Sequence, residues 1–379
     1  MSSQIETKVF KSVDEIGKDA IDSLVDDGFF TYGWLKTMEI SKPPIDLDPF
    51  YVTAYHKGEL AAFTPCFRDI AGQYFQYGPE AIPYMKRALN IYSRLGLGQK
   101  HVLLCYSPWC FRTKAFCSNH LNKKLLLRKL SEKIDEICKK EKILFSSFLF
   151  ISEFDRDFMS SLENLGYHKT VFWKPMLYLD VSWRSFDDYL QSLGKNTRYQ
   201  VKREIRSCME NGVVVEKVTD FEEISKTLSD LSFQLFLKYN KWAQRLDPFF
   251  YESLSNWAKA NTKVWIAKKK DVIVGFTLFI SKEKTLDFFL VGFDYAAQGK
   301  TDFTYFNLAY YTPIKWAIEE GIQKIYYRWG SEESKYKRGC KPETLYSLVK
   351  CRNKILNSQF SNSLKISKKI REFTGKLEY

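Results

Sequence analysis

The stretch KVWIAKKKDVIVGFTLFISKEKTLDFFLVGF, Lys263–Phe293, decides the fold of the C-terminal half of the chain. It contains three apolar segments, KVWIAKK, VIVGFTLFIS and TLDFFLVGF, which short charged turns separate. Segments of this length that are rich in β-branched and aromatic residues, and that end at turns, are typical of strands. The sequence therefore predicts three consecutive strands of one sheet.

Helical patterns flank these strands. SFDDYLQSLG begins with a capping box, Ser185 and Asp188, and a second box at Thr219 and Glu222 predicts another helix start. The remaining elements are predicted as a helix over NTRYQVKREIRSCMENG, a helix kinked at Pro313 over TDFTYFNLAYYTPIKWAIEEG, and a last strand, QKIYYRW. Two helices, three strands, a helix and a strand indicate an α/β layer with a mixed sheet.

The first half shows a similar order of elements. FYVTAYHKGELAAFTPCFR predicts two strands around a Lys-Gly turn, and HVLLCYS and ILFSSFLFIS predict two more. Leu126, Leu130, Ile134 and Ile137 recur at helical spacing between them. EFDRDFMSSLENLG predicts a short helix, and TVFWKPMLYLDV a further strand. We therefore expect domains at 1–166 and 167–350, followed by a basic segment at 351–379.

The charge of the chain favours anionic partners. Its 379 residues carry a formal net charge of +13, with a sequence pI of about 9.1. Polyanions such as RNA are one explanation, and lysines on ordinary solvated faces are the other. Apolar residues make up 45% of the chain, which excludes general disorder.

Cysteine and histidine patterns argue against metal or disulfide chemistry. The eight cysteines contain no CxxC pair, and the four histidines do not combine with them at zinc spacing. The polar opening MSSQIETKVFKSVDEIG does not resemble a secretory signal, and apolar runs fall short of the ~20 residues that span a bilayer. We expect a cytoplasmic protein without a metal, whose oligomeric state the sequence leaves open.

Three strings carry a resemblance to a known family. They are SFDDYLQSLGKNTRYQVKREIR, GFDYAAQGKTDFTYFNLAYYTPIKWAIEEGIQKI and KYKRGCKP. In this order they resemble the GNAT fold of N-acyltransferases in its duplicated, FemAB-like form, which includes enzymes of peptidoglycan interpeptide bridges. The resemblance is strongest over Tyr167–Lys350 and implies two tandem GNAT-like domains, each a mixed sheet flanked by helices. It also implies transfer of an acyl or aminoacyl group from aminoacyl-tRNA or acyl-CoA to an amine, with no tightly bound cofactor.

Basic residues recur along one predicted helix. Lys195, Arg198, Lys202 and Arg206 lie three or four residues apart, so they share a face. Tyr199, Ile205 and Met209 are expected on the core side. The stripe either binds phosphates of the carrier, for which arginine is well suited, or is a solvated face.

A second basic group lies in YYRWGSEESKYKRGCKPETLYS, where Gly339 permits a bend at the edge of the sheet. The predicted carrier-binding residues in this bend are Lys335, Tyr336, Arg338 and Lys341. By the resemblance, Lys337 corresponds to the lysine that follows an aromatic residue in the family, and it would stabilise negative charge at the reacting carbonyl. Cys340 departs from the family pattern, in which this position is often aromatic. The alternative is a polar loop that blunts the sheet edge.

The junction GFDYAAQGKTDFTYF bears on the carrier. Enzymes of the GNAT fold that bind CoA place a glycine-rich loop here, whose N–H groups hold a pyrophosphate. Only Gly299 lies within this loop, so the sequence slightly favours aminoacyl-tRNA over acyl-CoA.

Acyl transfer needs hydrogen-bond donors for an oxyanion and a route for the amine proton. Backbone N–H groups of FLVGF, freed by a bulge, are the predicted donors. Asp294 and Asp287 are the candidate bases, ahead of Glu332 and Glu333, and each is also explained as an ordinary turn or surface carboxylate. Trp242 and the aromatic residues after it either line an acyl pocket or belong to the core.

Three functional hypotheses follow. The leading one is a cytoplasmic N-acyltransferase that acts by direct attack of an amine. The others are a non-catalytic RNA- or anion-binding protein on a GNAT scaffold, and an interaction protein whose first domain is a docking surface.

Overall fold

The computed structural model describes residues 5–41, 47–69, 90–91, 94–96, 102–172, 174–239, 245–299, 301–358 and 362. The chain divides into two compact units, and both are discontinuous in sequence. Unit 1 comprises Met1–Val25, Ile45–Pro175 and Glu343–Tyr379, and unit 2 comprises Asp26–Pro44 and Met176–Pro342.

An eight-stranded mixed sheet forms unit 1, in the order β1-β2-β3-β4-β6-β15-β7, with β5 beside β3. Its strands are β1 (Ile5–Phe10), β2 (Leu47–His56), β3 (Glu59–Asp69), β4 (Val102–Cys105), β5 (Phe116–Cys117), β6 (Phe145–Ser152), β7 (His168–Val171) and β15 (Leu345–Cys351). The pair β4–β6 is parallel, and the other pairs are antiparallel.

Helices α1 (Lys18–Leu24), α4 (Lys123–Lys140) and α5 (Arg156–Asn164) belong to unit 1. The four apolar residues of α4 that the sequence placed on one face are all buried in the core of the unit. Their spacing of three and four residues puts them on one stripe of the helix, which explains why this helix was predicted correctly.

Unit 2 contains a seven-stranded sheet in the order β14-β8-β13-β12-β11-β10-β9. Its strands are β8 (Met176–Asp180), β9 (Val213–Val218), β10 (Thr262–Lys269), β11 (Val272–Lys282), β12 (Thr285–Phe293), β13 (Lys324–Tyr326) and β14 (Lys341–Glu343). Strands β9 to β12 run antiparallel, and β12–β13 is parallel. The three strands predicted in Lys263–Phe293 are therefore confirmed, with β12 matching its predicted bounds.

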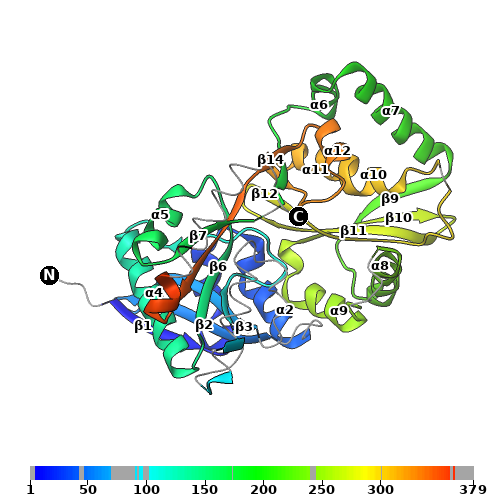
Figure 1. The fold of residues 1–379 in the computed structure, drawn as a ribbon. Helices are drawn as coiled ribbons and strands as arrows, with labels where there is room; N and C mark the ends of the chain where they lie inside the picture. Colours follow the sequence, from blue (N-terminus) through cyan, green and yellow to red (C-terminus); the bar gives the residue numbers. More distant parts are fainter. Residues whose placement is uncertain are drawn as a thin grey trace. The chain divides into compact units, whose positions relative to one another are not determined.

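Helices cover both faces of this sheet (Figure 1). One face carries α6 (Phe186–Ser192), α7 (Lys195–Glu210), α10 (Thr304–Phe306), η5 (Asn307–Tyr311), α11 (Thr312–Glu319) and α12 (Glu332–Lys337). Element η5 is a single turn of π-helix and is called the π-turn below. The other face carries η2 (Gly28–Phe30), α2 (Tyr32–Ser41), α8 (Ser225–Tyr239) and α9 (Pro248–Trp257). The predicted fold class, two α/β units that each have a mixed sheet flanked by helices, is confirmed.

The unit boundaries differ from the predicted ranges because two segments pack away from their neighbours in sequence. Helix α2 packs against α9 in unit 2, and a Cβ on Gly33 would lie 2.1 Å from the carbonyl oxygen of Trp257. At the other end, β15 pairs with β6 and β7 in unit 1. Of the predicted segment 351–379, only 351–358 and 362 are described.

Several elements differ from the predictions, and the predicted last strand QKIYYRW is reduced to β13, Lys324–Tyr326. TVFWKPMLYLDV is not one strand, because it contributes β7 to one sheet and β8 to the other, with Pro175 between them. Helix α8 begins at Ser225 rather than at the predicted box, Thr219 and Glu222. The irregularity near Pro313 is the π-turn Asn307–Tyr311 that precedes it, since proline is accommodated in the first turn of α11.

Candidate functional site

Strands β12 and β13 part within the sheet of unit 2. They pair from Thr285 with Lys324 to Asp287 with Tyr326, where β13 ends while β12 continues to Phe293. The chain after β13 follows β8 instead, since Tyr327 N–H donates to Leu177 O at 2.7 Å. Alternate backbone groups of β12 therefore face the side that β13 has left.

A β-bulge lies at the same place. On the opposite edge of β12, Leu278 pairs with Leu290 and Phe279 pairs with Phe288, so Phe289 is the additional residue. The Phe289 ring packs against Phe29, Trp34 and Phe250, with centroid distances of 6.1, 5.3 and 6.1 Å. This packing fixes the bulge that the sequence placed in FLVGF.

Arg328 stands beside this bulge. Its guanidinium lies 5.3 Å from the centroid of the Phe289 ring, within cation–π range. Its backbone has φ of +59°, a left-handed conformation that is uncommon for a residue with a side chain. The backbone after β13 is thus held in a sharp bend next to the parted strands.

The buried ammonium of Lys335 holds this bend. Its Nζ donates to the carbonyl oxygens of Tyr327, Arg328 and Trp329 at 2.8, 3.1 and 3.0 Å. The residue is only 5% exposed, and burial lowers its pKa to about 8. Lys335, which was predicted to contact the carrier, therefore positions the backbone at the end of β13.

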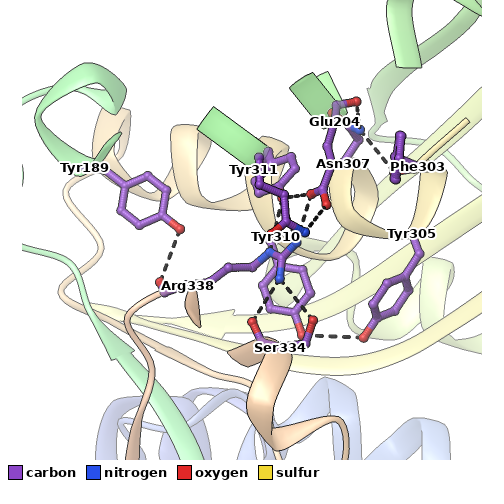
Figure 2. A network of polar contacts seen from close by, with 10 residues as sticks. Tyr189, Glu204, Phe303, Tyr305, Asn307, Tyr310, Tyr311, Ser334 and Arg338 are labelled. Carbon is purple, nitrogen blue, oxygen red and sulfur yellow. Dashed lines mark hydrogen bonds and ion pairs between the residues drawn. The ribbon is translucent and has the colours of Figure 1, made fainter. Parts of the chain in front are cut away.

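An ionic network behind the site connects α7, the π-turn and α12 (Figure 2). Arg338 donates to Glu204 Oε2 at 2.9 Å and to the Tyr311 hydroxyl at 2.8 and 3.2 Å. Its Nη1 also donates to the carbonyl and hydroxyl oxygens of Ser334, and the Tyr311 hydroxyl donates to Glu204. The two charged side chains are 1% and 3% exposed, so Arg338 is part of the scaffold and is not displayed for a carrier.

Tyrosines and a cysteine fill the space between the π-turn and the end of β13. Tyr310 stacks on Tyr327 with centroids 4.8 Å apart, and the hydroxyls of Tyr305 and Tyr310 are 3.5 Å apart. Burial raises the pKa of the Cys340 thiol to about 12. Because the thiolate is the nucleophilic form, this cysteine is unsuited to covalent catalysis.

The other predicted residues of the α12 region lie at the surface. Lys337 forms an i,i+4 ion pair of 2.7 Å with Glu333, and Tyr336 is 46% exposed. Lys341 pairs with Asp180 at 2.9 Å. The structure therefore separates the predicted basic group into two buried, structural cations and two exposed, ion-paired ones.

Helix α7 presents part of its predicted basic stripe. Lys195, Lys202 and Arg206 are exposed, whereas Arg198 donates to the carbonyl oxygens of Leu190, Gln191 and Leu193 at the end of α6. The expectation that Tyr199 and Met209 face the core is wrong, since they are 72% and 71% exposed. The inward face consists of Val201, Glu204 and Cys208, with Ile205 half-buried.

The two candidate bases occupy different environments. Asp287 is 7% exposed and forms the last pair of β12 with β13, directly at the parting. Asp294 Oδ1 accepts hydrogen bonds from the N–H groups of Ala296 and Ala297, which stabilise a turn. Glu332 and Glu333 are exposed in the first turn of α12, and Trp242 lies outside the described residues.

Two carboxylates occupy the loop between β12 and α10. Besides the Asp294 turn, Asp302 Oδ2 accepts from Gly299 N–H at 2.9 Å and pairs with Lys269 at 3.0 Å. Asp302 is 3% exposed. Three N–H groups of this loop are therefore already bound to carboxylates, which oppose the binding of a pyrophosphate at the same groups.

Sequence reasoning missed Glu204, Tyr311 and Arg328 as site components. Glu204 lies one turn from Val201 and Cys208, so a helical projection of α7 places it inward, opposite the exposed cations. The positions of Tyr311 and Arg328 could not be predicted in this way, because residue spacing does not indicate a π-helical turn or a left-handed backbone conformation.

Within the described ranges, His, Cys, Asp and Glu side chains do not form a group of three or more that could bind a metal ion. The helices in the same part of the chain are all too short or too polar to cross a membrane.

Comparison with known proteins agrees with this architecture. A profile of the FemAB-like family, described as peptidoglycan biosynthesis/recognition, matches residues 12–376. The crystal structure of FemX has a TM-score of 0.60 and 12% identity, and the match covers 93% of this chain and 100% of FemX. A C-terminal domain assigned to a lysylphosphatidylglycerol synthetase from Agrobacterium fabrum has a TM-score of 0.57 and 13% identity, with 93% and 95% covered.

A tandem GNAT protein from the clavulanic acid pathway also has this fold, with a TM-score of 0.51, 8% identity, and 91% and 98% covered. At these identities the likeness establishes the tandem GNAT-like fold, as the sequence predicted. Comparison with curated protein sequences gave no match.

Proposed function

The chain belongs to the FemAB-like family, which indicates a transferase, and from this premise we propose that it is an N-acyltransferase that uses an aminoacyl-tRNA donor. The acyl or aminoacyl group passes from the activated ester to a substrate amine by direct attack. The observation that carries this proposal is the parting of β12 and β13 at the bulge of Phe289. A parted sheet offers backbone donors to a bound carbonyl, which an uninterrupted sheet does not.

The reaction balances without a covalent enzyme intermediate. The amine lone pair attacks the ester carbonyl carbon, and the carbonyl oxygen becomes an oxyanion that accepts hydrogen bonds from N–H groups of β12. Collapse of the tetrahedral intermediate breaks the bond to the ribose oxygen, which takes up the proton that the amine has lost. Asp287 at the parting is the group proposed to accept the proton of the amine, and the raised pKa of Cys340 supports direct attack over a thioester.

Two observations support an RNA carrier over CoA. In the loop before α10, the N–H groups of Ala296, Ala297 and Gly299 already donate to the carboxylates of Asp294 and Asp302. These hydrogen bonds disfavour the binding of a pyrophosphate to the same loop. Exposed cations also lie along α7, where Lys195, Lys202 and Arg206 have no acidic partner among the described residues. Lys337, on the same side of the sheet, is proposed to contact the donor near its reacting end, where an anion would compete with Glu333 for the ammonium.

The acceptor is proposed to be a primary amine, and the description of the family makes peptide amines of peptidoglycan the first to test. Purified protein is incubated with tRNA charged with labelled amino acids, or with labelled acyl-CoAs, together with amine acceptors. Label in an amide product from charged tRNA supports the proposal. Product from acyl-CoA alone would establish the alternative donor, and absence of product from both, for all amines tested, would refute an acyltransferase.

A further inference from the structure

The outward face of α7 carries an unusual combination of side chains. Five residues lie within one stripe of the helix at spacings of three or four: Lys195, Tyr199, Lys202, Arg206 and Met209. All five are exposed, and the stripe extends roughly 20 Å at 1.5 Å per residue. An aromatic ring and a methionine that are more than two-thirds exposed are not explained by packing within the chain.

The cations of the stripe have no acidic partner within the described part of the chain. Lys195, Lys202 and Arg206 form neither an ion pair nor a side-chain hydrogen bond with described residues. Some exposed lysines on other helices do pair with acids, as Lys337 does with Glu333 and Lys226 with Asp230. On α7 one acid, Glu204, is turned inward and neutralised by Arg338, which leaves only Glu210 on the exposed side.

Burial of Glu204 therefore has an electrostatic consequence at the opposite surface. A helix with five basic and two acidic residues loses one of its acids to the interior, so its outward face is left with a single dominant sign. Like charges at adjacent turns repel each other unless an anion is bound. Arg203, whose guanidinium lies 5.9 Å from the Phe303 ring, adds a cation at the margin of the stripe.

We propose that this stripe binds single-stranded RNA, with phosphates on Lys195, Lys202 and Arg206 and an unpaired base stacked on Tyr199. The inference rests on the proposed function, for which it names the surface that receives the donor. Charge complementarity selects a polyanion, and the exposed ring between the cations selects one with unstacked bases. A double-stranded RNA offers the same phosphates but no free base, so the stripe should prefer single strands.

Binding of fluorescein-labelled RNA, followed by anisotropy, tests this proposal with a 12-nucleotide single strand and a blunt duplex of the same sequence. The variant Lys195→Gln/Lys202→Gln/Arg206→Gln should bind the single strand at least tenfold more weakly. The slope of log K against log salt should fall by about 2, because each phosphate contact contributes roughly 0.7 for single strands. Tyr199→Ala should weaken single-strand binding at least fivefold and leave duplex binding unchanged.

A matched control removes the same charge from another helix. Lys124, Lys139 and Lys140 are exposed on α4, so their triple replacement by Gln should leave RNA binding within twofold of the unchanged protein. An equal loss of RNA affinity in the two triple variants would overturn the proposal that the α7 stripe binds RNA, since net charge alone would then explain binding. Binding of the unchanged protein to vesicles with 30% phosphatidylglycerol, with RNA binding unaffected in the α7 variant, would assign the face to a membrane and also overturn it.

Failure of the stripe and failure of the proposed function are distinguishable. If the α7 triple variant binds RNA normally and still transfers an amino acid from charged tRNA, RNA binding by the stripe is refuted and the proposed acyltransferase activity is supported. If the α7 triple variant loses single-strand binding and the α4 variant does not, but the unchanged protein makes no amide product, RNA binding by the stripe is supported and the proposed acyltransferase activity is refuted.

Discussion

Arg338 and Glu204 form a buried, hydrogen-bonded ion pair at 2.9 Å although 134 positions separate them in the sequence. The pair joins the end of α12 to the inner face of α7, and the hydroxyl of Tyr311 connects both to the π-turn. One network of hydrogen bonds therefore holds α7, the π-turn and α12 together.

Removing one member of this pair should be strongly destabilising. Arg338→Met leaves the Glu204 carboxylate buried without its counter-charge, so we expect the free energy of unfolding to fall by about 3–5 kcal/mol. Urea denaturation followed by circular dichroism measures the change. Lys341→Met, which removes an exposed ion pair with Asp180, is the control and should have little effect. Equal stability of the two variants would show that the buried network contributes nothing.

Lys335 should make stability depend on pH in a defined window. Its pKa is about 8 in the folded protein and near 10.5 when unfolded, so between these values the unfolded chain binds the extra proton. Stability contributed by this group must then rise with pH across the window, by at most about 1.4 kcal/mol per pH unit. We expect the difference in unfolding free energy between the unchanged protein and Lys335→Met to increase from pH 8 to pH 10. A difference that is flat over this range would contradict the assignment.

Asp287 and Asp294 should differ in their effects on catalysis. Asp287→Asn removes the proposed proton acceptor, so kcat should fall at least about 100-fold with little change in KM, and the acid limb of the pH–rate profile should disappear. Asp294→Asn alters a turn, and we expect its kcat to stay within about tenfold. Steady-state rates of amide formation with charged tRNA provide the comparison. The reverse order of the two effects would exclude Asp287 as the base.

Lys337 and Glu333 should act in opposite directions on the donor. Because their side chains form an ion pair of 2.7 Å, Glu333→Ala releases the ammonium for an incoming anion. We expect Glu333→Ala to lower KM for charged tRNA, and Lys337→Ala to reduce kcat/KM at least tenfold. Both effects should shrink as salt is raised. If neither substitution changes the kinetics, the ion pair is only a surface feature of α12.

Local patterns in the sequence predicted much of the fold but little of the site. The meander Lys263–Phe293 and the helix α4 were predicted correctly, because alternating or helical spacing reports burial directly. Neighbouring residues in KYKRG differ in burial, because Lys335 and Arg338 are buried whereas Lys337 is exposed. That difference depends on a short helix packing against α7 and the π-turn, and a contact over such a separation leaves no periodic signal.

The boundaries of the two units could not be predicted from local patterns either. Nothing in the composition of residues 26–44 shows that α2 packs on α9, more than two hundred positions later. The close approach of Gly33 to Trp257 is one of the few hints, and it is visible only once the helices are placed.

The exchange of these segments limits how the protein can be dissected. Because the polypeptide enters and leaves each unit more than once, a single cut anywhere between residues 45 and 342 strips one sheet of a strand or one core of a helix. A gene fragment that encodes only the second half would produce a chain with an uncovered apolar surface in place of α2. Neither unit is therefore encoded by one continuous stretch of the gene, so neither can be expressed alone as a simple fragment.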